Sequence, residues 1–178
     1  LMIQRLVDAW MCFPGLILLL VLMSVFGIGI LQIIIVLSLR WGFSGSRIIR
    51  GAVISLKENF YIKASVSVGC STSRIILKHI IPNLMAPTII LFTTRVPDII
   101  MTEAALSFLG FGIPPPDPTW GGMLSGSARQ YMVRAPWMVI WPGLALAVVV
   151  YCINMFGDAL RDILDPKLKG LAGKFDTK

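Results

Sequence analysis

Residues 135–157, APWMVIWPGLALAVVVYCINMFG, contain no charged side chain. A helix that crosses the roughly 30 Å hydrocarbon core of a bilayer needs about 20 predominantly apolar residues, which matches this run. A helix on the surface of a soluble protein would instead alternate apolar and charged positions with the helical period. The run therefore predicts a transmembrane helix, and with it an all-α membrane protein.

The composition of the whole chain agrees with this prediction. Of 178 residues, 56% are hydrophobic and only 14% are charged, which departs from a soluble domain in both respects. The formal net charge is +7, but the basic residues flank apolar runs, so membrane topology explains them better than nucleic-acid binding. Three cysteines are odd in number and far apart, which indicates packing residues and neither a disulfide framework nor a metal cluster: Cys12, Cys70 and Cys152.

Two further membrane-spanning segments are expected near the start of the chain. Residues 9–39 carry no charge, and one helix over them would be about 46 Å long, which is too long for one straight span. The Gly27-Ile28-Gly29 sequence favours two spans, residues 8–26 and 28–46, although one tilted helix is the alternative.

A span at residues 84–109 completes a predicted bundle of about four transmembrane helices, and it contains Pro87 and Pro97. Residues 40–83 carry a single acid, Glu58, among many basic residues, and residues 158–178 are also basic, so both segments are expected in the cytoplasm. The Gly-rich and Pro-rich loop at residues 110–136 is then expected on the outer face. Three spans would satisfy the charge pattern equally well, so charge alone does not decide the count.

The cytoplasmic segment at residues 61–82 predicts two short amphipathic helices hinged at Gly69, with Pro82 ending the run. The alternative is an interfacial helix that lies on the lipid headgroups.

The positions of Gly69 and Pro82 resemble the cytoplasmic EAA signature of permeases from binding-protein-dependent ABC importers. Other motifs, in chain order, resemble the second permease subunit of dipeptide, oligopeptide and nickel importers, which has a MetI-like transmembrane domain. They run over nearly the whole chain: Phe13-Pro14-Gly15, Arg47-Ile48-Ile49-Arg50-Gly51, Leu106-Ser107-Phe108-Leu109-Gly110-Phe111-Gly112, Pro114-Pro115, Pro118-Thr119-Trp120-Gly121, Ala135-Pro136-Trp137, Pro142-Gly143-Leu144, Gly157-Asp158-Ala159-Leu160-Arg161-Asp162 and Leu164-Asp165-Pro166.

The resemblance implies a single permease domain over residues 1–178, in the cell membrane with a cytoplasmic C-terminus. The chain begins at Leu1, and we expect it to lack the family's N-terminal helices. The implied partners are a second permease subunit, two P-loop ATPase subunits, an external substrate-binding protein and the lipid bilayer, with no nucleic acid. The ATPase-coupling segment would include Lys63, Ala64, Ser65, Gly69, His79, Ile81 and Pro82. The outer loop, with Pro114, Pro115, Trp120 and Gly121, would face the binding protein or the partner permease.

One position departs from the family pattern. Where the signature has Glu-Ala-Ala, this chain has Lys63-Ala64-Ser65, so a base replaces the usual acid. Charge reversal at a docking surface costs on the order of a few kcal/mol if the partner group is unchanged. Either the ATPase carries a compensating acid, or coupling is weak.

Three ionisable residues fall inside the third span: Arg95, Asp98 and Glu103. They are expected either to line a path or to serve structure, since Arg95 and Asp98 are spaced to pair on one helical face. His79 has no Cys, Asp or Glu close to it, so no metal site is predicted. The chain has neither a phosphate-binding G-x-x-x-x-G-K-[ST] motif nor a supported catalytic arrangement, so it is not expected to be an enzyme or to bind a cofactor; its partners would use ATP.

The leading hypothesis is a permease subunit for di- or oligopeptides. Alternatives are a nickel permease of the same family, an inactive truncated fragment, and a secondary transporter or channel. The last would show inverted repeats or a ring of pore charges, and neither is evident in the sequence.

Overall fold

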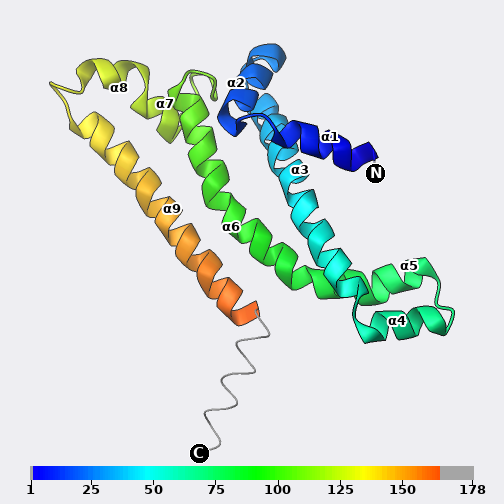
Figure 1. The fold of residues 1–178 in the computed structure, drawn as a ribbon. Helices are drawn as coiled ribbons and strands as arrows, with labels where there is room; N and C mark the ends of the chain where they lie inside the picture. The colour runs from blue at the N-terminus through cyan, green and yellow to red at the C-terminus, as the bar shows by residue number, and fades with distance from the viewer. Residues whose placement is uncertain (1, 165–178) are drawn as a thin grey trace, which may run out of the picture.

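Helices make up all the secondary structure in the part of the chain that the computed structural model describes, residues 2–164, excluding the side chains of Ile3, Ser127 and Arg129 (Figure 1). The expected basic tail and the Asp165-Pro166 pair lie largely outside these residues. In order, the elements are α1 (Met2–Met11), α2 (Gly15–Phe26), α3 (Ile30–Lys57), α4 (Phe60–Ser67), α5 (Thr72–Ile75), the π-helix η1 (Ile76–Ile80), α6 (Ile81–Phe108), α7 (Trp120–Leu124), α8 (Gly126–Tyr131) and α9 (Trp137–Leu164).

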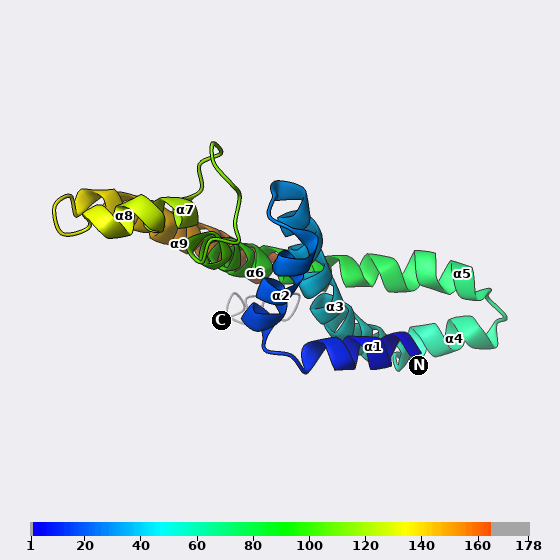
Figure 2. The same cartoon turned by 90° about the horizontal axis from the view of Figure 1, so that it is seen from above.

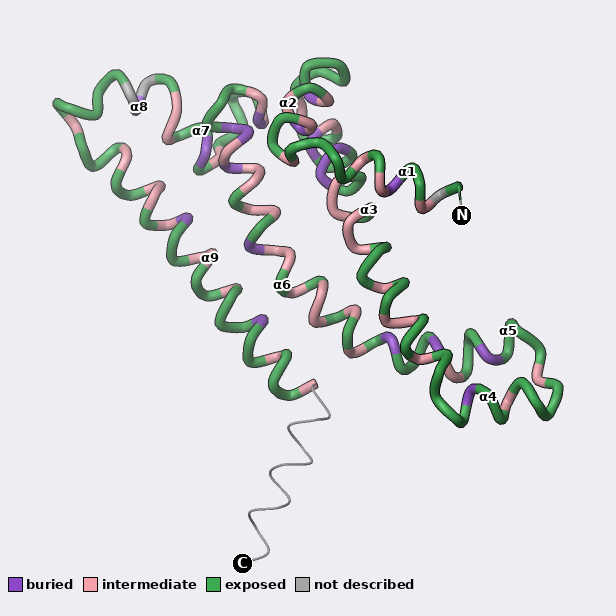
Figure 3. Tube along the Cα trace, viewed as in Figure 1, coloured by how far each residue is buried: buried purple, intermediate pink, exposed green. Residues whose placement is uncertain are grey.

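The three long helices lie side by side, with α6 between α3 and α9 (Figures 1 and 2). Viewed from above, they form one layer, and α1 and α2 pack beside α3 (Figure 2). The short helices α7 and α8 lie at one end of this layer, and α4 and α5 project sideways from the other (Figure 1). Most of the chain is exposed, as the green tube in Figure 3 shows, so lipid or other protein must cover the apolar faces.

Within residues 2–164, two helices are long and apolar enough to cross a membrane. They are α9 and the continuous helix Thr72–Phe108, which joins α5, η1 and α6. The segments Gln4–Met11 and Gly15–Phe26 make a third candidate only if this pair, bent by 101°, is one span. The expected count of four spans stays a prediction.

Residues 8–26 were expected to form a single span, and this is wrong as a helix assignment. The helix breaks between Met11 and Gly15, and Pro14 stands at the N-cap of α2 with extended backbone (φ −56°, ψ 125°). Proline has no N–H to continue the preceding helix and disfavours helical geometry in the residue before it, so α1 and α2 point in different directions.

Helix α1 packs antiparallel along α3. Arg47 pairs with Asp8 at 3.6 Å, and the Arg50 guanidinium donates to the Gln4 amide oxygen at 2.9 Å. The rings of Trp10 and Phe43 meet edge to face, with centroids 5.2 Å apart.

A core cluster joins α2, α3 and α6 near the loop end of the layer. It consists of Leu19, Met23, Ile33, Val36, Leu37 and Leu106. Phe111 and Ile113, just beyond α6, pack against it, so the loop that follows α6 starts from a fixed position.

Candidate functional site

The segment between α3 and α6 folds back on itself as a helical hairpin, here called the α4–α5 hairpin (residues 58–75). Helix α4 ends in a Schellman motif: the Cys70 N–H donates to the Ser65 carbonyl at 3.1 Å, and the Gly69 N–H donates to the Val66 carbonyl at 2.9 Å. Gly69 occupies the left-handed position of this motif with φ of 80°. The structure therefore has the hinge at the glycine that the sequence indicated.

An apolar cluster holds the hairpin against the end of α3. Ile62 of α4 and Ile75 of α5 are buried with Ile80 and Leu84 of the following helix. The residues of α3 and of the hairpin turn that pack against them are Ile49, Ala52, Val53, Leu56 and Cys70. The hairpin is thus a packed unit that projects from the layer (Figure 1).

The outer surface of the hairpin is basic and apolar. Phe60 is 89% exposed and Val68 is 83% exposed, although both are large apolar residues. Lys63 and Ala64 are exposed beside them, and Ser65 is half-buried, with its hydroxyl donating to the Tyr61 carbonyl. No acid pairs with Lys63 within residues 2–164. An exposed apolar patch with an unpaired charge is the chemistry of a protein-docking surface.

Pro82 was expected to end the helical run, and this is wrong. The chain stays helical from Thr72 to Phe108, with Pro82 in the first turn of α6 directly after η1. A π-helix shifts the backbone hydrogen bonds to i→i+5, which accommodates the N–H that proline lacks. His79 lies in η1, with its ring centroid 6.2 Å from that of Tyr61, and Ile81 is exposed.

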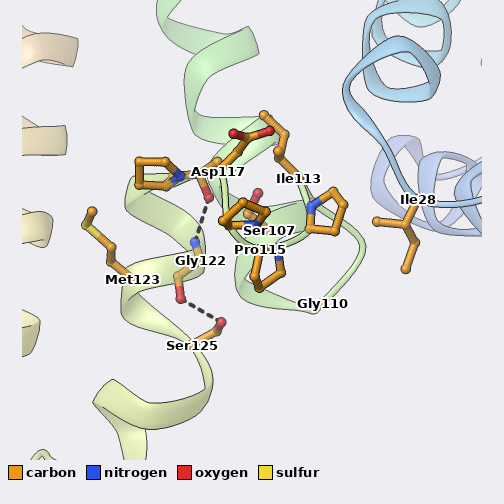
Figure 4. A pocket seen from close by; sticks show the side chains of 14 residues that line it. Ile28, Ser107, Gly110, Ile113, Pro115, Asp117, Gly122, Met123 and Ser125 are labelled. Atoms are coloured by element: carbon orange, nitrogen blue, oxygen red, sulfur yellow. Dashed lines mark hydrogen bonds between the residues drawn. The ribbon is translucent and has the colours of Figure 1, made fainter.

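The Pro-rich loop after α6 forms an open pocket of about 500 Å³ (Figure 4). Pro114, Pro115 and Asp117 line it, and Ile28, from the connection between α2 and α3, faces the loop across it. Thr119 caps α7 by accepting a hydrogen bond from the Gly122 N–H at 2.9 Å. Trp120 is exposed and Gly121 is buried against the backbone of Ala104.

The expected intramembrane charges fall into two separate groups on α6. Arg95 pairs with Asp98 at 3.3 Å, three residues apart on one face. Glu103 instead accepts a hydrogen bond from the buried Ser107 hydroxyl at 2.6 Å. The Arg95–Asp98 ion pair that a structural role requires is therefore present. A role of these charges in lining the translocation path stays a prediction.

A model of one protein family, described as "Binding-protein-dependent transport system inner membrane component", matches residues 1–170. The chain belongs to this family. It is 40% identical over 169 residues to the "Glutathione transport system permease protein GsiD" of Shigella flexneri serotype 5b and of Escherichia coli O6:K15:H31. Each match covers 95% of this chain and 55% of the relative, so the chain spans about half the length of these curated relatives.

The family description names an inner membrane component of a transport system, and the relatives are named as permease proteins. The hairpin and the proline loop lie at opposite ends of the long helices (Figure 1). The sequence predicted the hairpin on the cytoplasmic side and the loop on the outer side.

Sequence reasoning missed one cluster in this permease, at Trp41. The guanidinium carbons of Arg40 and Arg95 lie 5.4 Å and 4.9 Å from the centroid of the Trp41 ring. The sequence does contain a signal for this cluster, the base Arg40 next to Trp41 inside an expected span, because a base at membrane depth needs a partner.

Proposed function

We propose that this chain is a permease subunit of a binding-protein-dependent ABC importer for di- or oligopeptides. It would form part of the translocation path, with a second permease subunit completing it, two P-loop ATPases on the cytoplasmic side and a substrate-binding protein outside. Family membership supports the importer class. The name of the relatives supports a peptide cargo over nickel complexes, because glutathione is a tripeptide.

The observation that carries the proposal is the α4–α5 hairpin. It is packed on its inner side and presents Phe60 and Val68, exposed, at the end of the layer. In this proposal the hairpin is cytoplasmic and docks in a groove of an ATPase. Movement of the ATPase would then act on α6 directly, because α5 continues into α6 without a break.

Lys63 adds a requirement on the partner. It is exposed on the same helix as Phe60 and has no acid beside it within the described chain. We infer that the ATPase groove of this importer carries an acid opposite Lys63, so that the base in place of the usual acid attracts its partner.

The test compares two valines at opposite ends of the protein. Val68 is 83% exposed on the hairpin, and Val133, before α9, is 96% exposed. Because burying a valine contributes about 1.5 kcal/mol or more, Val68→Ser should lower the affinity of the assembled permease for its ATPase subunits roughly tenfold, as measured by co-purification and ATP hydrolysis. Val133→Ser should leave the affinity unchanged.

Lys63→Glu, measured in the same assay, should weaken association at least as much. Equal losses from the two serine variants would remove the hairpin from the ATPase interface, and full association of Lys63→Glu would refute an acid opposite Lys63.

The other elements of the proposal follow from the same orientation. The pocket of the proline loop would face outward, toward the binding protein or the partner permease, and the C-terminus would be cytoplasmic. No observation favours a nickel cargo, an inactive fragment or a transporter that works alone.

A further inference from the structure

A groove of about 520 Å³ runs between α3 and α6. Most of its lining is aliphatic or aromatic, such as Ile34, Leu37 and Phe92. Trp41 of α3 and Arg95 of α6 also line it, and they are in contact through the Arg95 guanidinium, 4.9 Å from the Trp41 ring centroid. The groove thus combines an apolar wall with a cationic group about halfway along α6.

The positive charge beside this groove exceeds the negative charge. Arg95 has Asp98 as its partner at 3.3 Å. Arg40, whose guanidinium carbon lies 5.4 Å from the Trp41 centroid, has no ion-pair partner within residues 2–164.

Around Trp41 and Arg40, hydrogen-bond donors also outnumber acceptors. The Trp41 indole Nε1 is buried and has no acceptor in the described part of the chain. The Arg40 guanidinium lies against Gly15, the first residue of α2, where the helix dipole is positive and Pro14 supplies no side-chain cap. A group with acceptor oxygens beside the two guanidinium groups would balance their charge and accept their hydrogen bonds.

We propose that Arg40, Trp41 and Arg95 form a subsite that binds the carboxylate of a transported peptide, with the side chains of the peptide against the apolar wall of the groove. The planar Arg95 guanidinium, which lines the groove, matches a carboxylate, and the Arg40 guanidinium near the Trp41 ring adds positive charge. This proposal rests on the proposed function for its peptide cargo. Its test needs no ATPase, so that it can fail independently of the coupling proposal.

The experiment measures binding of trialanine and of trialanine amide to the full chain in nanodiscs of zwitterionic lipid, by tryptophan fluorescence. The two peptides differ only in the C-terminal carboxylate. A charge-assisted hydrogen bond contributes enough that the dissociation constant of trialanine should be at least about tenfold lower than that of the amide. A Trp41→Phe variant should lose most of the fluorescence response.

Three arginine variants assign the effect. Arg95→Gln should abolish the difference between the two peptides, and Arg95→Lys should retain part of it, because it keeps the charge but not the fork of donors. Arg47→Gln is the matched control, since Arg47 lies on α3 but pairs with Asp8, away from the groove, and it should retain the whole difference.

Several results would overturn the proposal. One is equal binding, or no binding, of the two peptides to the unsubstituted chain, a comparison that requires no variant to fold. Another is full discrimination in Arg95→Gln. A third is a response to anionic phosphatidylglycerol in the nanodisc but not to either peptide, which would assign the cluster to a lipid phosphate.

Discussion

Replacing Gly69 by alanine should open the α4–α5 hairpin. Gly69 has φ of 80°, and an added Cβ would meet no atom within 4 Å, so the substitution introduces no clash. Its whole effect is then the cost of left-handed backbone for an L-residue, about 1–2 kcal/mol. At 1.4 kcal/mol per factor of ten, the equilibrium between the closed and open turn should shift toward the open form by about 5- to 30-fold.

Amide hydrogen exchange measures this shift directly. The reporters are the two N–H groups of the Schellman motif, those of residue 69 and of Cys70, which donate to Val66 and Ser65. Their protection should fall by the same factor in Gly69→Ala, while amides in α9 should not change. Gly69→Asn is the matched control, because asparagine tolerates the left-handed region better, and it should lose less protection. Unchanged protection in Gly69→Ala, or an equal loss in both variants, would refute the assigned turn.

Two other substitutions probe close contacts elsewhere. Gly121→Ala would place a Cβ 2.7 Å from the Ala104 Cα, so α7 must move away from α6. We expect the free energy of unfolding to fall by about 1–3 kcal/mol, with a lower thermal midpoint. Gly51→Ala, on α3 with no atom within 4 Å of the added Cβ, should not lower the midpoint. Asp98→Asn removes the acid that competes for Arg95, so it should tighten the binding of trialanine several-fold and leave the binding of trialanine amide unchanged. If the Arg95–Asp98 pair is purely structural, the variant should instead have a lower thermal midpoint and unchanged affinity for both peptides.

The sequence predicted those features of the fold that depend on local composition. The region of α9 was evident because its uncharged run has the length of a bilayer core, and the Gly69 hinge because a glycine separates two apolar patterns. Both signals lie within a few turns of the chain. No tertiary contact was needed to interpret them.

The features that the sequence did not predict depend on single prolines and on pairing between helices. Pro14 interrupts an uncharged run that extends over residues 9–39. Pro82 is accommodated next to a π-helix, which the apolar periodicity does not predict. The Arg40, Trp41 and Arg95 cluster requires α3 to pack against α6 with one particular register. Only the i,i+3 pair of Arg95 and Asp98 could be predicted from sequence spacing, because both residues lie on one helix.

The continuous helix Thr72–Phe108 has a mechanical consequence. Its α6 part, Ile81–Phe108, has 28 residues and gives a lever of about 42 Å at 1.5 Å per residue, with the hairpin at one end and the proline loop at the other. A tilt of about 5° around its middle would displace the two ends by roughly 2 Å in opposite directions. Arg95 lies close to the fulcrum and would hardly move, so the charged cluster would stay in place while the two ends of the lever change position.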